Sequence, residues 1–146
     1  MRFTGSGRVA RVTDSEIDFA RLSEQVRAAL NLAGFNAYIA HDLEDHPGFE
    51  VEVEEGPGDD AGVYVGWRPS PRLLDAALVA ADRADVDDAA RKMHTMLKRQ
   101  MCEVALQVLS AAGFAAAVGS DYRARQVRVE ALASNRLGPL IDAEAS

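Results

Sequence analysis

Cysteine and long apolar stretches are scarce in this chain of 146 residues. Because Cys102 is the only cysteine, no disulfide can form within the chain, and a metal site built on several thiolates is excluded. No uninterrupted apolar run approaches the roughly 20 residues that a membrane-spanning helix needs. The N-terminal residues contain no apolar stretch typical of a signal peptide. We therefore expect a soluble, cytoplasmic protein without a membrane partner.

Lysine is also rare, and positive charge is unevenly distributed. The chain has 14 Arg and two Lys against 23 Asp and Glu, and its formal net charge is −7. Between Ala28 and Trp67 there is no Lys or Arg, while nine acidic residues occur there. Between Arg91 and Arg128 seven basic residues outnumber two acidic ones. Because nucleic acids and anionic membranes attract cationic proteins, the overall charge argues against both as general partners.

Three stretches have the apolar spacing of amphipathic helices. The first begins at a capping box in residues 13–16 and ends before Gly34, a residue suited to the left-handed conformation at a helix end. The second begins at Ser70, which is followed by proline at the first helical position. The third begins at the acidic residues 85–88 and runs for about 24 residues to Gly113.

Strand patterns lie between these helices. Strict alternation predicts a strand at residues 49–53. Residues 63–67 predict another strand, and Tyr38-Ile39-Ala40 precedes both, so we expect a three-stranded meander. Residues 114–118 and 126–133 predict a closing hairpin. The sequence therefore predicts an α+β two-layer sandwich, with a mainly antiparallel sheet of about five strands and three helices.

Two segments resemble each other, Ala28–Glu54 and Gln107–Glu130. Each contains a helix end, an Ala-Gly-Phe corner and a valine-rich strand. A helix-hairpin unit cannot bury its apolar faces alone, so an internal duplication with two units sharing one sheet would explain the pattern. The alternative is chance, because a helix, a glycine cap and a hairpin often follow one another in α+β proteins.

The domain organisation follows from these elements. We expect a flexible N-terminal arm or short edge strand at residues 1–12, a single domain at 13–134 and a C-terminal tail at 135–146. The related halves would cover about residues 13–68 and 86–134. The order of a helix, three strands, one or two helices and two strands resembles that of type III secretion chaperones and related small dimeric domains. This resemblance covers the order of elements and includes no shared motif.

Glutamates alternate with apolar residues along the strand at 49–53 and repeat about every 7 Å on one face. That spacing is close to the distance between phosphates along a nucleic-acid strand, so the face could imitate a nucleic acid and occupy a basic cleft on another protein. The candidate partner-binding residues are Glu50, Glu52, Glu54, Asp59 and Asp60. The alternative is the solvated face of an antiparallel sheet, opposite Arg125 or Arg128.

The segment His41–His46 holds two imidazoles and three carboxylates in six residues. Such nitrogen and oxygen donors coordinate zinc and other divalent ions, so His41, Asp42 and His46 are candidate ligands of a metal-dependent domain or enzyme. Because Asp and His are also common turn residues, a solvated loop is the alternative.

Motifs for cofactor binding and nucleophilic catalysis give little support to enzyme function. The letters of Gly5–Ala10 fit the dinucleotide fingerprint, but that motif needs a buried strand before its glycines and a helix directly after them. Only four residues precede Gly5, and the first helix cap comes at Thr13. We expect no cofactor and assign no catalytic residue.

The predicted long helix carries an apolar stripe longer than a two-layer domain of this size must cover. The stripe consists of Met93, Leu97, Met101, Val104, Val108 and Ala111. Its excess predicts a homodimer interface at Met93, Leu97 and Met101. Basic residues follow another side of this helix, namely Arg91, Lys92, Lys98 and Arg99. They could contact phosphate, although no aromatic side chain interleaves them for base stacking.

These patterns favour a small, non-catalytic protein-binding module that forms a homodimer. It would contact a protein partner with a basic surface through the acidic sheet face, as a nucleic-acid mimic or inhibitor. A metal-dependent domain at His41–His46 and a nucleic-acid binder acting through the long helix are the alternatives.

Overall fold

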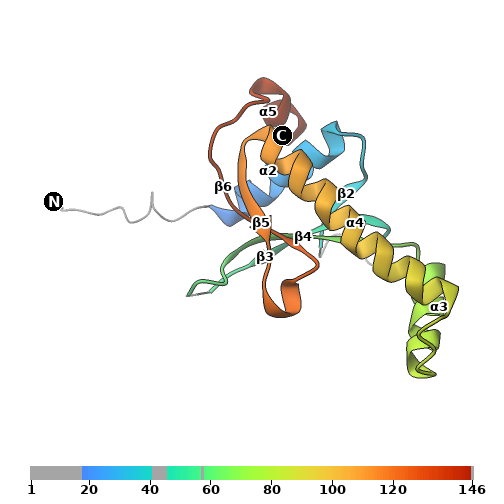
Figure 1. Cartoon of the computed structure of the whole chain (residues 1–146). Coiled ribbons are helices and arrows are strands. Elements are labelled where there is room, and N and C mark those ends of the chain that lie inside the picture. Colours follow the sequence, from blue (N-terminus) through green and yellow to red (C-terminus); the bar gives the residue numbers. More distant parts are fainter. Residues whose placement is uncertain (1–17, 41–45, 57, 146) are drawn as a thin grey trace.

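The computed structural model describes residues 18–40, 46–56 and 58–145. Within them the chain has the α+β fold, with a five-stranded mixed sheet and four α-helices (Figure 1). The elements are α2 (Phe19–Leu32), β2 (Ala37–Ile39), β3 (Gly48–Glu54), β4 (Gly62–Arg68), α3 (Pro71–Asp82), α4 (Ala89–Ala112), β5 (Phe114–Val118), the 3-10 helix η1 (Asp121–Arg123), β6 (Val127–Leu132) and α5 (Pro139–Ala145). In this part of the chain no helix is both long and apolar enough to cross a membrane.

The strands are ordered β2-β3-β4-β6-β5 across the sheet. Three neighbouring pairs are antiparallel, but β2 runs parallel to β3, with Ile39 opposite Val51. The predicted three-stranded meander is therefore wrong at its first strand. All three residues of β2 are buried, so its sequence shows no alternation, and strand direction depends on the path of the connecting chain.

Two of the predicted helix starts are confirmed by their caps. The Ser70 hydroxyl accepts a hydrogen bond from the backbone N–H of Leu73 at the start of α3. At the start of α4, the Asp88 carboxylate accepts from the N–H groups of the next turn, and α4 has the expected 24 residues. Each cap satisfies backbone donors that have no partner inside the helix. The predicted capping box at residues 13–16 lies outside the described residues. At the start of α2, the Asp18 carboxylate accepts a hydrogen bond from the backbone N–H of Arg21.

Gly34 and Gly113 occupy equivalent corners at the ends of α2 and α4. Their φ angles are +100° and +104°, a left-handed conformation that costs other residues free energy. After these similar corners the chain pairs differently, because β2 is parallel to its neighbour and β5 is antiparallel to β6. The internal duplication therefore stays a prediction that rests on the corners and the sequence.

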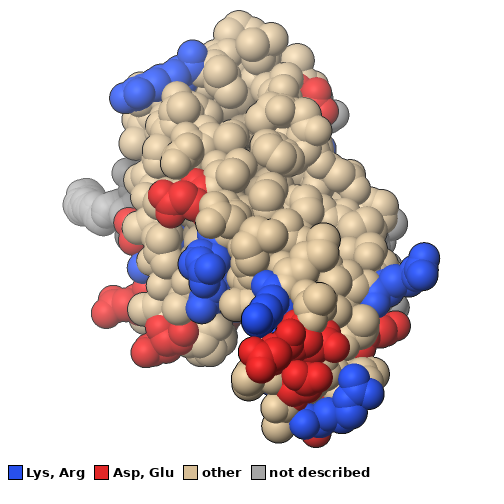
Figure 2. Space-filling model, turned by 45° about the vertical axis from the view of Figure 1, so that its right-hand side comes forward, with Lys and Arg blue, Asp and Glu red and all other residues tan. Residues whose placement is uncertain are grey.

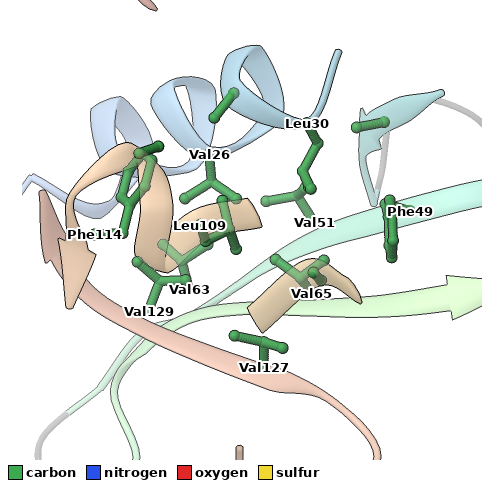
Figure 3. Close-up of a cluster of buried hydrophobic side chains, with 14 of the residues drawn as sticks. Val26, Leu30, Phe49, Val51, Val63, Val65, Leu109, Phe114, Val127 and Val129 are labelled. Atoms are coloured by element: carbon green, nitrogen blue, oxygen red, sulfur yellow. The ribbon is translucent and has the colours of Figure 1, made fainter. Parts of the chain in front are cut away.

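The core lies between the sheet and the two helices α2 and α4, which cover the same face (Figures 1 and 3). The largest fully buried side chains are Phe49, Leu30, Leu109, Ile141, Val26, Val51, Val63, Val65, Val127 and Val129. On α4 the buried residues are Cys102, Ala105, Leu109 and Ala112, one position along the chain from the predicted stripe. One residue turns the helix by about 100°, and these mostly small side chains let α4 approach the sheet closely.

The C-terminal residues form a further helix, α5, so the described chain has four helices and not the predicted three. Ile141 of α5 is fully buried in the core, and α5 packs on α2. The guanidinium of Arg27 on α2 donates to the carbonyl oxygen of Glu144 at 3.2 Å. The sequence suggested a tail because α5 is short and contains little apolar periodicity.

Helix α3 and the first half of α4 extend away from the sheet as an antiparallel hairpin (Figure 1). The packing of α3 is mainly against α4, through the buried Ala77 and Ala80. With alanines at this contact, the larger side chains of the hairpin point elsewhere.

Candidate functional site

The acidic residues predicted on β3 lie on the sheet face opposite the helices. Phe49 and Val51 are buried beneath α2, whereas the intervening Glu50 and Glu52 are partly exposed, as the alternation predicted. On this face Glu52 lies opposite Tyr64 of β4, and Tyr64 lies opposite Arg128 of β6. No α-helix of the described chain covers this face (Figure 1).

Arginines neutralise much of this acidic face. Arg123, from η1, places Nη1 3.2 Å from a carboxylate oxygen of Glu52 and Nη2 2.8 Å from one of Glu54. Arg68 of β4 lies 3.7 Å from Glu50. The three glutamates thus face two guanidinium groups, and their effective negative charge is smaller than the sequence suggested.

Arg123 is the residue that organises this face, and sequence reasoning missed it. Only 8% of its surface is exposed, and its guanidinium lies 4.0 Å from the centre of the Tyr64 ring, a cation–π distance. Burial alone would lower the pKa of Arg123, but Tyr122 and hydrogen bonds to Glu52 and Glu54 raise it, so the side chain stays charged. The prediction had considered Arg125 and Arg128 instead, and nothing in the sequence distinguishes Arg123 from them.

Glu50 lies in the most enclosed part of the acidic face. Burial raises the pKa of its carboxyl group, Arg68 opposes that change, and Glu52 adds to it. The net effect favours the protonated form, so ionised Glu50 is an energetic cost for the folded state.

Exposed negative charge lies at the turn between β3 and β4. Glu55, Asp59 and Asp60 are exposed there. The backbone of the turn is held in place because the Tyr64 hydroxyl donates to the carbonyl oxygen of Asp60 at 2.7 Å and the Arg128 guanidinium donates to those of Asp59 and Ala61. Between this turn and β5 is a hollow of about 330 Å³ whose charged lining residues are Asp60, Arg128 and Glu130.

The metal hypothesis falls mostly outside the described residues, because His41 and Asp42 are not among them. His46 is described, and its Nε2 lies 2.6 Å from the side-chain nitrogen of Asn36. Its backbone oxygen accepts a hydrogen bond from Tyr38. Within residues 18–40, 46–56 and 58–145 no group of three His, Cys, Asp or Glu side chains is arranged to hold a metal ion.

The predicted dimer residues on α4 lie in different environments. Met93 is half exposed, Leu97 is partly buried, and Met101 packs against the core. Other large apolar side chains of α3, α4 and the loop between them are also exposed. We define the hairpin surface as Leu78, Val79, Val86, Met93 and Met96, which are 41–64% exposed. Figure 2 shows a broad area without charged residues over the upper and middle part of the molecule in this view.

Both signs of charge border the hairpin surface, and Figure 2 shows them mixed at the lower end of the molecule. Lys92 lies 3.7 Å from Asp87, and both side chains are largely exposed. Burial lowers the pKa of His94, and the nearby Lys98 lowers it further. Of the four basic residues proposed for phosphate binding, Lys92 therefore has an acidic neighbour in the loop between α3 and α4.

Comparisons with known proteins give no relative from which a function could be transferred. No family model, no curated protein and no solved structure matches this chain.

Proposed function

We propose that the protein is a small, non-catalytic protein-binding module that self-associates through the hairpin surface. The observation that carries this proposal is that five large apolar side chains are 41–64% exposed on an α-helical hairpin that extends beyond the sheet. Single exposed apolar residues are ordinary on protein surfaces, whereas several on one hairpin favour an interaction site. Covering these side chains with a second hairpin would remove them from water at a favourable free energy.

Charges of both signs on the hairpin allow a second copy as the occupant. The end of the hairpin carries Asp82, Asp85, Asp87 and Asp88 together with Arg83, Arg91 and Lys92, a net charge of −1, and Lys98 and Arg99 lie further along α4. In an antiparallel arrangement of two hairpins, the carboxylates at the end of each would face Lys98 and Arg99 of the other. A symmetric contact of this kind is self-complementary, as the interface of a two-fold dimer must be.

Amide hydrogen exchange at two protein concentrations tests self-association. If the hairpins dimerise, the amides of residues 71–100 exchange more slowly at high concentration than at a concentration where the protein is monomeric. Amides of β4, in the centre of the sheet, serve as the internal control and keep their rates. If the molecular mass rises with concentration but the hairpin amides exchange at the same rate in both samples, the dimer contact lies elsewhere.

A second contact is proposed at the acidic sheet face, for a protein partner with a basic surface. Because Glu50, Glu52 and Glu54 are paired with arginines, the contribution of exposed charge comes mainly from Glu55, Asp59 and Asp60. Exposed acidic groups of this kind accelerate encounter with a basic surface and are screened by salt. Imitation of a nucleic acid would need a regular row of unpaired carboxylates along β3. Arg68 and Arg123 interrupt that row by pairing with its glutamates.

The matched variants for this contact are Glu55→Gln with Asp59→Asn and Asp60→Asn, compared with Glu103→Gln on the exposed side of α4. For a partner isolated by pull-down, we expect the triple variant to associate more slowly and with a weaker dependence on salt. The Glu103→Gln control should associate as the wild type does. If the triple variant also behaves as the wild type, the acidic sheet face is not the contact.

A further inference from the structure

A groove of about 550 Å³ lies between the first two turns of α2 and the end of β3. It forms because β2 ends at Ile39, opposite Val51, while β3 continues to Glu54. The side of β3 beyond Val51 therefore has no neighbouring strand among the described residues. The groove is lined by Ala20, Ser23, Glu24, Ile39, Ala40, Val51, Glu52, Val53 and Glu55.

Beyond Val51, no backbone group of the described residues pairs with β3 on the side of this groove. On the β2 side, the N–H of Phe49 donates to Asn36 and the carbonyl of Val51 accepts from Ala40, both at 2.8 Å. Alternate residues of a strand bond to opposite neighbours, so the N–H and C=O of Val53 face the same side as those of Val51. There they lie beyond the end of β2. An exposed strand edge of this kind is normally covered, because it can pair with another chain.

The rim of the groove is negatively charged. Glu24 from α2, Glu52 from β3 and Glu55 directly after β3 line it, and none of its described lining residues is Lys or Arg. Glu24 and Glu52 each have one arginine partner, Arg27 and Arg123, and both glutamate side chains remain 44% exposed. The glutamates would attract a basic segment and repel an acidic one.

We propose that the N-terminal segment of this same chain, residues 8–12, occupies the groove and pairs with the open edge at Val53. Residues 1–13 contain three arginines and no acidic residue, although the whole chain has a formal charge of −7. Two of these, Arg8 and Arg11, flank Val9 and Ala10, and Val12 follows, so the segment combines cationic and strand-forming side chains. This occupant is independent of self-association through the hairpin surface, but its groove shares Glu52 and Glu55 with the proposed acidic contact.

The length of the chain permits this arrangement. Ala20, in the first turn of α2, lines the groove, and residue 12 precedes the helix cap Asp18 by six positions. Six extended residues span at most about 20 Å. Residues 8–12 can therefore reach β3, which a distant segment could do only at a larger entropic cost.

The exchange rate of the Val53 amide, followed by NMR, tests the proposal on the full chain. With residues 8–12 in the groove, the Val53 N–H is hydrogen-bonded, and we expect a chain that begins at residue 13 to exchange it roughly tenfold faster. The Leu109 amide, in the middle of α4, reports on global stability. If it changes in parallel, the rates are compared as the ratio of Val53 to Leu109.

A charge variant isolates the role of the arginines. In the full chain, Arg8→Gln with Arg11→Gln should accelerate Val53 exchange, while Arg125→Gln with Arg136→Gln, which removes the same charge elsewhere, should not. Equal Val53 exchange in the full and shortened chains overturns the proposal. So does protection of Val53 that depends on protein concentration, because a second copy would then fill the groove.

Discussion

The guanidinium of Arg123 lies 2.8 Å from the carboxylate of Glu54, although 69 residues separate them in the chain. This contact, with that to Glu52, fastens the turn between β5 and β6 onto the outer face of β3. Arg123 also covers Tyr64, which is only 4% exposed although its side chain is on the face without helices. The outer face of the sheet is therefore an ordered part of the fold.

Replacing Arg123 should destabilise the protein. Arg123→Ala leaves Glu52 and Glu54 without their shared cation and exposes Tyr64, and we expect a loss of about 2 kcal/mol in the free energy of unfolding. Arg125→Ala, two residues away and exposed, should change it by less than about 0.5 kcal/mol. Urea denaturation of both variants checks this prediction. Equal effects would mean that the Arg123 contacts contribute no net stability.

The pH dependence of stability should report on Glu50. Because the folded-state pKa of Glu50 is raised, its contribution to stability is fully present below the unfolded pKa and is lost as pH rises through the folded pKa. Glu50→Gln cannot ionise, so the free energy of unfolding of this variant relative to the wild type should increase from acidic to neutral pH. Denaturation series at several pH values measure the difference. A relative stability that falls with pH would show that the Arg68 pair outweighs burial.

The two glycine corners provide a matched pair of substitutions. Both Gly34 and Gly113 have positive φ, so alanine at either position should cost roughly 1 kcal/mol from backbone conformation. At Gly34 a Cβ would have open space, but at Gly113 it would lie 1.6 Å from the carbonyl oxygen of Ser134. We expect Gly113→Ala to cost roughly 2–4 kcal/mol in total, measured by thermal or urea unfolding. Equal costs would contradict the close approach of residue 134 to this corner.

The thiol of Cys102 should be unreactive in the folded protein. It is 8% exposed, and burial, with a further contribution from Glu103, raises its pKa, so little thiolate is present or accessible. We expect a thiol reagent to label native protein far more slowly than protein unfolded in urea, at pH values up to about 9. Rapid native labelling would indicate that α4 separates easily from the sheet.

The elements that sequence predicted well have local causes. The caps at Ser70 and Asp88, the glycine after α4 and the alternation along β3 are each decided by residues a few positions apart. These local preferences predict the structure correctly because the tertiary contacts at these positions favour the same conformation.

The features that sequence did not predict depend on contacts between distant residues. The pairing of Arg123 with Glu54 and the direction of β2 arise only when separate segments meet. On α4, the core stripe at Cys102 and Ala105 consists of small side chains and was hidden beside the larger apolar residues of the adjacent stripe. Those larger residues appeared to be the core because the helix is apolar over more than one side.

Sedimentation equilibrium of Met96→Glu tests self-association through the hairpin surface most directly. Met96 is 41% exposed, so a charge there should leave the monomer folded while it disrupts an apolar interface. Val118→Glu, at a similarly exposed site on β5, is the matched control. Wild type and Val118→Glu should sediment as dimers at micromolar concentration, whereas Met96→Glu, with an unchanged circular dichroism spectrum, should sediment as a monomer. A monomeric wild type, or a dimer that Met96→Glu leaves intact, would contradict self-association through the hairpin surface.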